Sequence, residues 1–213
     1  MPKSLHYIAI EGVIGVGKTS LATLLSKRLR AKLVLEKHED NPFLADFYQS
    51  PQRYAFQTQM FFLLNRYRQQ LDLWQRDLFH PMVITDYLFA RDRIFASLTL
   101  EEREFLLYEK LASLLEREVP RPDLVVYLQA NTSQLMANIK KRGRVYEKNI
   151  AESYIRSLVE AYNNFFFHYK ETSLLVVDTT QIDFVNHQHD LDNLIEQITM
   201  PLGGIKFYIP RLK

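Results

Sequence analysis

The strongest chemical signal in the chain is a glycine-rich segment near its start. Residues 12–19 read GVIGVGKT and match the phosphate-loop pattern G-x-x-x-x-G-K-[ST] in full. In such a loop, backbone N–H groups converge on phosphate oxygens, and glycine is needed where a Cβ would block that approach. Lys18 is expected to contact the β- and γ-phosphates, and the Thr19 hydroxyl to ligate Mg²⁺. The residues predicted to bind ATP here are Gly12, Gly15, Val16, Gly17, Lys18, Thr19 and Ser20.

Several carboxylates lie at or near the ends of predicted strands, namely Glu11, Glu36, Asp86 and Asp178. Ligands of parallel sheets bind at the carboxyl ends of the strands, so we expect three or four of these groups around the phosphate site. Phosphoryl transfer to an alcohol needs metal ligands and a group that takes a proton. Asp86 is the candidate metal carboxylate and Glu36 the candidate base. Either could instead be a helix N-cap or a solvated loop acid.

The densest basic cluster covers residues 140–144, which read KKRGR. A glycine stands there between Arg142 and Arg144 at the expected end of a helix. Arginine stays charged and binds phosphate oxygens with two parallel N–H groups. We interpret residues 140–150 as a hinged lid whose arginines clamp the transferring phosphate; the simpler alternative is a solvated helix end.

Short apolar runs alternate with helical patterns along the chain. We predict parallel strands at residues 5–10, 33–36, 81–85, 123–128 and 174–177. Strands that alternate with helices, the first one carrying the phosphate loop, predict an α/β fold with a doubly wound, five-stranded parallel sheet flanked by helices. Residues 205–209 are a candidate for an added edge strand. A long helix is predicted from residue 51 to about residue 78, with a stripe through Leu64, Leu71, Trp74 and Leu78 that is core or a subunit interface.

Composition limits the class of protein. The chain has 213 residues, of which 47% are hydrophobic and 24% charged, as in a soluble globular domain. The net charge of +2 gives no argument for a nucleic-acid or membrane partner. There is no cysteine, which excludes disulfides and thiolate metal sites. The first strand starts too early to leave room for a signal peptide, so a cytoplasmic location is expected.

These motifs together make the chain resemble the deoxyribonucleoside kinase family, most closely its bacterial members. The resemblance covers nearly the whole chain and rests on four segments: IEGVIGVGKTS, NPFLADFYQSPQRYAFQTQMFFLLNR, RGRVYE and DTTQIDF. It implies one P-loop kinase domain over residues 1–213, with ATP and Mg²⁺ as cofactors and a homodimer as assembly. The implied reaction is ATP-dependent 5′-phosphorylation of a deoxyribonucleoside in nucleotide salvage.

The resemblance also implies roles for single residues around the acceptor. Glu36 takes the position of the glutamate that accepts the 5′-hydroxyl proton, although Lys37 and His38 replace the usual Pro-Val after it. Tyr48 and Glu147 fall where the family holds the 3′-hydroxyl. The residues assigned to the substrate are Glu36, Tyr48, Gln59, Arg66, Asp86, Asp92, Phe95 and Glu147.

The implied base contacts favour some nucleosides over others. Gln59 falls where an amide pairs with the base edge, and Phe95 where an aromatic ring stacks on it. Arg66 and Asp92 fall where members that prefer cytosine or purines place a polar pair. A purine deoxynucleoside or deoxycytidine is therefore expected ahead of thymidine.

On the donor side, the resemblance gives Lys18, Arg142 and Arg144 catalytic roles beside Glu36. Thr19 and Asp86 are the implied metal ligands. Asp183 and Phe184 match the loop whose backbone reads the base of ATP.

One departure concerns the turn after the third strand. The family commonly has an acid-Arg-Ser triplet there, whereas this chain has Asp86, Tyr87 and Leu88. Arg91, Arg93 or the lid are the candidates to replace the missing arginine.

Two other functions stay open at this point. A nucleoside monophosphate kinase of the thymidylate kinase type shares the loop, the carboxylate and an arginine lid. It would need an arginine for the acceptor's phosphate, and Tyr87 occupies the obvious place. A non-enzymatic nucleotide-dependent switch would bind nucleotide without needing Glu36 or Gln59.

Overall fold

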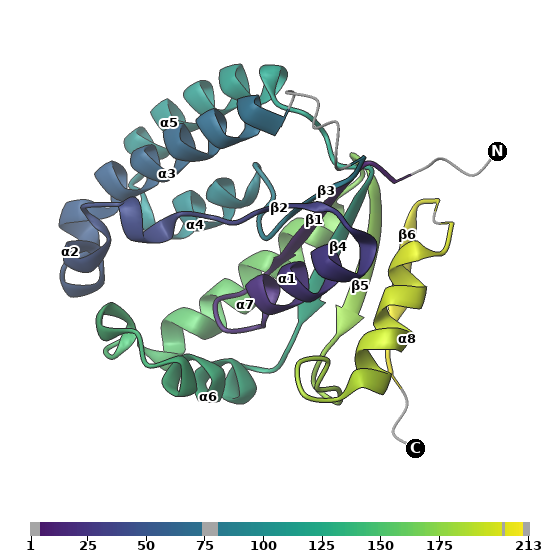
Figure 1. The fold of residues 1–213 in the computed structure, drawn as a ribbon. Helices are drawn as coiled ribbons and strands as arrows, with labels where there is room; N and C mark the ends of the chain where they lie inside the picture. Colours follow the sequence, from purple (N-terminus) through teal and green to yellow (C-terminus); the bar gives the residue numbers. More distant parts are fainter. Residues whose placement is uncertain (1–4, 74–80, 202, 211–213) are drawn as a thin grey trace.

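A six-stranded parallel sheet forms the centre of the molecule (Figure 1). The computed structural model describes residues 5–73, 81–201 and 203–210. The strand order is β2-β3-β1-β4-β5-β6, and every neighbouring pair is parallel. The strands are β1 (Tyr7–Gly12), β2 (Lys32–Val34), β3 (Val83–Thr85), β4 (Leu124–Gln129), β5 (Ser173–Asp178) and β6 (Ile205–Tyr208).

Helices cover both faces of the sheet and extend beyond it. Figure 1 shows α1 and α8 in front of the sheet and α7 behind it, while α3 and α5 run side by side away from the strands. Short 3₁₀ turns lie at His38–Asp40, Glu116–Glu118 and Val145–Glu147. The helices are α1 (Lys18–Leu29), α2 (Leu44–Gln49), α3 (Pro51–Leu73), α4 (Arg91–Thr99), α5 (Glu102–Leu115), α6 (Thr132–Arg142), α7 (Glu152–His168) and α8 (Gln188–Thr199).

The central strands have the composition that their position requires. Every residue of β1 is buried, and β4 is buried from Leu124 to Leu128. A parallel strand covered by helices on both faces has no polar face, so its sequence reads as a continuous apolar run. The polar residues of these strands then collect at the carboxyl ends, where Glu11 stands on β1 and Gln129 on β4.

The sixth strand corrects the prediction of a five-stranded sheet. β6 pairs with β5 in register from Leu174↔Ile205 to Val177↔Tyr208, so the candidate edge strand is part of the sheet. On one side of β6, Lys206 Nζ donates to Gln197 Oε1 of α8 at 2.8 Å. On the other side, Ile205 and Phe207 are exposed. An edge strand with one uncovered face lacks the continuous apolar run that marked the inner strands.

The long predicted helix is α3, which is described as far as Leu73. Leu64 and Leu71 of the predicted stripe are exposed on it, whereas Trp74 and Leu78 lie outside the described residues. Among the residues that the structure describes, no helix is long and apolar enough to cross a membrane.

Candidate active site

A cavity with about 760 Å³ of empty space, part of it open solvent, lies at the carboxyl ends of β1 and β3. The phosphate loop, the end of β2, helices α2, α3 and α4, and the segment after α6 all contribute side chains to it. Every side chain that the sequence assigned to the substrate lines this cavity, together with Lys18, Thr19, Arg142 and Arg144. Segments far apart in the chain thus meet at one site.

The phosphate loop has the backbone that its glycines allow. Gly12 and Gly15 have φ angles of 149° and 87°, in the range that disfavours other residues. A Cβ on Gly12 would lie 2.5 Å from the Leu128 carbonyl oxygen, and one on Gly15 would lie 2.8 Å from that of Leu135. Both contacts are closer than packing permits, so a side chain at either position would force the loop apart.

Lys18 and Thr19 point from the start of α1 towards neighbouring polar groups. Lys18 Nζ donates to the carbonyl oxygens of Gly12 at 2.7 Å and Val13 at 3.1 Å. Burial and, after it, the charge of Arg91 lower the pKa of Lys18 to about 7, although the carboxylates of Glu11, Asp86 and Glu36 each act to raise it. Thr19 Oγ1 donates to Asp86 Oδ2 at 2.5 Å. The two predicted metal ligands therefore lie together.

Glu36 lies among basic groups at the inner end of the cavity. Arg66 donates to its Oε1, and Arg91 Nη1 donates to its Oε2 at 2.6 Å. Its backbone N–H donates to Asp86 Oδ1 at 2.7 Å, which ties residue 36 to the turn after β3. Burial alone would raise the pKa of Glu36, but Arg66 and Arg91 outweigh it and hold the pKa at about 2. The carboxylate is thus ionised and fixed in orientation.

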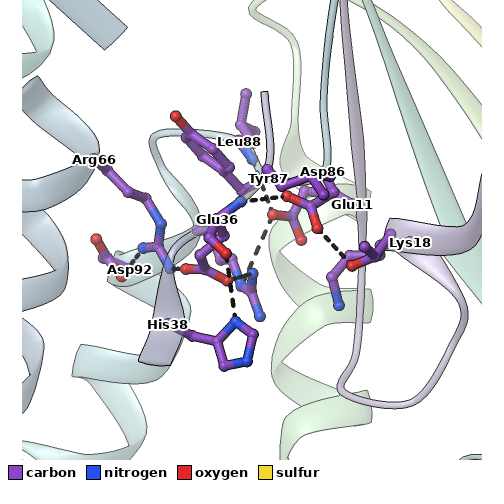
Figure 2. A network of polar contacts seen from close by, with 12 residues as sticks. Glu11, Lys18, Glu36, His38, Arg66, Asp86, Tyr87, Leu88 and Asp92 are labelled. Atoms are coloured by element: carbon purple, nitrogen blue, oxygen red, sulfur yellow. Dashed lines mark hydrogen bonds and ion pairs between the residues drawn. The ribbon is translucent and has the colours of Figure 1, made fainter. Parts of the chain in front are cut away.

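Arg66 joins Glu36 to a second carboxylate. Its guanidinium pairs with both Glu36 and Asp92, as Figure 2 shows. The ring of Tyr87 lies 5.7 Å from Arg66 Cζ and is fully buried beneath it. A guanidinium over an aromatic face is favourable, so Tyr87 supports the position of Arg66.

The structure distinguishes the candidate replacements for the missing arginine. Arg91, on the first turn of α4, lines the cavity and contacts Glu36. Arg93 instead pairs with Glu109 at 2.5 Å and Glu116 at 2.8 Å, on the side of α4 that faces α5. Among the described side chains, Arg91 is therefore the one that brings a guanidinium to Glu36 from this turn.

The predicted base-binding residues share one wall. Gln59 is buried on α3, and its Nε2 donates to Thr99 Oγ1 at 3.3 Å. Within the described part of the chain, Gln59 Oε1 has no hydrogen-bond partner. Phe95 projects from α4 into the same cavity, with Arg91 Cζ 5.2 Å from its ring. The wall therefore combines a buried acceptor with an aromatic face.

The opposite wall comes from α2 and the segment after α6. The rings of Tyr48 and Tyr146 stack with centroids 5.9 Å apart. Glu147 is buried and receives Arg142 through two bonds, Nη2 to Oε1 at 2.5 Å and Nε to Oε2 at 3.1 Å. Arg144 Nη1 lies 3.7 Å from the same carboxylate. Both predicted lid arginines therefore meet the residue predicted to hold the 3′-hydroxyl.

The remaining predicted ATP contacts lie outside this cavity. Phe184 is buried against the loop, with its Cζ 3.0 Å from where a Cβ on Gly17 would stand. The Asp183 carboxylate accepts from Asn186 Nδ2 at 2.7 Å and from the Asn186 backbone at 3.0 Å, which lowers its pKa. Val16 is buried within the loop and Ser20 is exposed on α1.

Sequence reasoning left some cavity residues without a role. His38, Tyr146 and Tyr154 line the cavity. Of these, only Tyr146 could have been expected there from the sequence, because it directly precedes Glu147. Glu11 was placed near the phosphate site but given no function, and it is fully buried. Asp178, grouped with it, lies instead in a separate depression with Asn163 and Thr180.

Comparison with known proteins identifies relatives over most of the chain. The family model described as deoxynucleoside kinase matches residues 8–202. The chain is 36% identical to the deoxyguanosine kinase of Bacillus subtilis over 197 residues, covering 90% of this chain and 95% of the relative. It is also 36% identical to the deoxyadenosine kinase of Dictyostelium discoideum over 171 residues, which cover 76% of this chain and 68% of that protein.

A solved structure has the same arrangement of elements. The deoxyadenosine kinase from M. mycoides with bound dATP superimposes with a TM-score of 0.79 at 25% sequence identity. The superposition covers 91% of this chain and 98% of that one.

Proposed function

Since the chain belongs to the deoxynucleoside kinase family, we propose that it transfers the γ-phosphoryl group of ATP to the 5′-hydroxyl of a deoxynucleoside. The chain is a phosphotransferase that phosphorylates a deoxynucleoside, with ATP as donor. The observation that carries the detailed proposal is the nearly buried Glu36, held by two arginines and tied through Asp86 to the phosphate loop. Because ATP is made inside the cell, we place the reaction in the cytoplasm.

Glu36 is the group that accepts the 5′-hydroxyl proton. Its pKa of about 2 keeps it ionised at neutral pH, so it can orient the hydroxyl through a charged hydrogen bond. So low a pKa makes it a weak base in isolation. Phosphoryl transfer has a loose transition state in which the proton moves late, so position matters more than base strength. Arg91 takes the place of the arginine that the family carries at position 87.

The donor phosphates are held by the loop and the lid. Lys18 and the loop N–H groups face the β- and γ-phosphates, and Arg142 and Arg144 close over the group in transfer. Polyphosphate charge beside Lys18 raises its pKa from about 7, so binding itself keeps this lysine protonated. Residues 140–150 act as the lid and exclude water, which would otherwise hydrolyse ATP.

The residues at the loop fit Mg²⁺. Thr19 Oγ1 and Asp86 Oδ2 lie 2.5 Å apart, and oxygen donors supplemented by substrate phosphates are the ligands that Mg²⁺ takes in kinases. Mg²⁺ held here would supply positive charge that offsets the negative charge of the donor phosphates. Thr19 and Asp86 would hold the ion, and Asp86 also fixes the backbone of Glu36.

The acceptor is a purine deoxynucleoside or deoxycytidine rather than thymidine. The Arg66–Asp92 pair and Gln59 offer donors and acceptors to the base edge, and Phe95 offers a stacking face. Tyr48 and Glu147 hold the 3′-hydroxyl. The similarity to a deoxyguanosine kinase and a deoxyadenosine kinase supports a purine acceptor.

The test is ADP release from ATP and Mg²⁺ with each of the four deoxynucleosides and, in parallel, their monophosphates. We expect turnover with deoxyguanosine, deoxyadenosine or deoxycytidine, little with thymidine, and none after chelation of Mg²⁺. Thymidine as the best acceptor would contradict the assigned base contacts. Turnover with monophosphates alone would contradict the role of Glu36.

The assembly is a homodimer formed through α3 and α5. These neighbouring helices expose leucines seven residues apart, which places each pair on one face: Leu64 and Leu71 on α3, Leu107 and Leu114 on α5. Two such apolar faces match each other across a twofold axis.

Light scattering should give the mass of a dimer for the wild type and of a monomer for L107E/L114E. F207E, at an exposed phenylalanine of β6, is the control that should stay dimeric. A monomeric wild type would refute this assembly.

A further inference from the structure

Glu11 is a fully buried carboxylate for which the proposed reaction has no use. It lies near the end of β1, and its side chain is 0% exposed. Oε2 accepts the Gly12 N–H and Oε1 accepts the Leu88 N–H, each at 2.9 Å. Burial of a carboxylate is costly unless its oxygens are paired, and here both are paired with backbone donors. So costly a group in the core requires an explanation beyond packing.

The two hydrogen bonds of Glu11 join two loops that the sheet does not connect. β1 and β3 are paired only as far as Ala9↔Thr85. Gly12 opens the phosphate loop, and Leu88 lies in the turn between Asp86 and Arg91. Beyond the last strand pair, the Glu11 side chain therefore fixes the turn relative to the loop, as Figure 2 shows for Glu11 and Leu88.

Glu11 also lies close to Arg91, on the side away from Glu36. Arg91 Nε is 3.9 Å from Glu11 Oε1, while Arg91 Nη1 donates to Glu36 at 2.6 Å. The side chain of Arg91 is buried between these two carboxylates. Arg91 thus bonds Glu36 directly, while the Glu11 carboxylate attracts its Nε from the other side and helps to fix the orientation of the guanidinium.

We propose that Glu11 is a positioning residue for phosphoryl transfer, whose carboxylate holds the turn 86–90 against the phosphate loop and thereby sets where Arg91 meets Glu36. It contacts neither substrate. This inference rests on the proposed role of Arg91 and Glu36 at the 5′-hydroxyl.

The test is E11Q, a substitution of equal shape. The glutamine can accept one of the two N–H groups, but its own NH₂ faces the other donor, and its charge is gone. We expect kcat to fall roughly 100-fold, the loss typical of small displacements of catalytic groups, with the KM for deoxynucleoside and ATP little changed.

Asp123 supplies a matched control at the other end of β1. Its Oδ2 accepts the backbone N–H groups of His6 at 2.9 Å and Tyr7 at 3.0 Å, so this carboxylate also holds two backbone donors, though with one oxygen and far along the strand from the site. D123N should lower the melting temperature while kcat stays at the wild-type value. If E11Q lowers kcat no more than D123N does, Glu11 is merely structural and the proposal is wrong.

A double-mutant cycle with R91M identifies the route of the effect. If Glu11 acts through Arg91, E11Q should cost less than about threefold in kcat in the R91M background, because coupled residues are not additive. The full loss in that background would overturn the proposal. If E11Q does not fold, E11D takes its place. Its side chain keeps the charge but is too short to reach both N–H groups, so the same fall in kcat is expected.

The role of Glu36 as the base and the role of Glu11 as a positioning residue can be refuted independently. Unchanged turnover in E36Q would remove the proposed base whatever Glu11 does. Loss of activity in E36Q with full activity in E11Q would leave the base in place and remove only the role of Glu11.

Discussion

The cavity has two sets of arginines that differ in burial and origin. Arg66 and Arg91 come from α3 and α4, and their side chains are 4% and 8% exposed. Arg142 and Arg144 lie at the end of α6 and just after it, and are 35% and 29% exposed. The inner set is fixed between carboxylates of the core. The outer set lies at a helix terminus followed by Gly143, whose φ of 69° ends the helix.

This difference separates two uses of the same side chain. At the inner end, each arginine neutralises carboxylates that would otherwise be buried alone, so function and folding depend on the same contacts. At the proposed lid, the ion pairs are partly solvated and contribute little to stability. A lid that has to open for substrate requires contacts that break at low cost, whereas the acceptor end gains from contacts that do not break.

The largest expected effect is on catalysis, in E36Q. Without the carboxylate that we propose as the proton acceptor, kcat should fall roughly 10²- to 10⁴-fold, the range for general bases, while the KM for deoxynucleoside changes little. ADP release under saturating substrates measures it. Unchanged turnover would show that the inner end only holds the fold.

The next effect is on stability, in R66M. Removal of Arg66 leaves Glu36 and Asp92 buried with less compensating charge, so the free energy of unfolding should fall by roughly 3–5 kcal/mol. Urea denaturation measures the change. R68M, an exposed arginine two residues along the same helix, is the control and should stay within about 0.5 kcal/mol of the wild type. Equal effects of R66M and R68M would refute the buried network.

A third effect is on pH dependence at the inner end. The pKa of Glu36 is lowered in the folded state, to about 2 from an ordinary 4.5, so its contribution is complete above pH 5 and is lost as the pH falls. Ionisation of Glu36 should contribute about 3 kcal/mol to the free energy of unfolding at pH 6, and roughly 2 kcal/mol of this contribution should be lost by pH 3. The contribution is measured as the difference in the free energy of unfolding between the wild type and E36Q. Comparison with E36Q cancels the other acids, and a constant difference across that range would contradict the pairing with Arg66 and Arg91.

The smallest effect is the stability change in R144M. Arg144 lies 3.7 Å from Glu147, which keeps its two bonds to Arg142. The free energy of unfolding should therefore change by no more than about 1 kcal/mol, the range of partly exposed ion pairs, while kcat falls clearly. Thermal unfolding and ADP release, measured on one preparation, test this separation. A loss of stability as large as that of R66M would remove the distinction between lid and inner end.

Much of the site was predictable because its residues stand in local patterns. The phosphate loop is one contiguous motif, and Gln59 and Arg66 recur seven residues apart on one helix, so both point the same way. The sixth strand was only a candidate, since an edge strand with one exposed face carries a weak signal. Glu11 and Tyr146 received no role, because a buried carboxylate and a stacked ring look ordinary in sequence.

The sequence by itself determined which chemistry to expect: a loop for polyphosphate, an acid proposed to accept a proton, and arginines to balance charge. Only the tertiary structure decided which of Arg91 and Arg93 joins Arg66 at Glu36. Arg91 and Arg93 differ by two residues, roughly 200° around α4, so one points into the cavity and the other towards Glu109 on α5. That rotation depends on where α4 begins and on how it packs between α3 and α7, and long-range contacts set both.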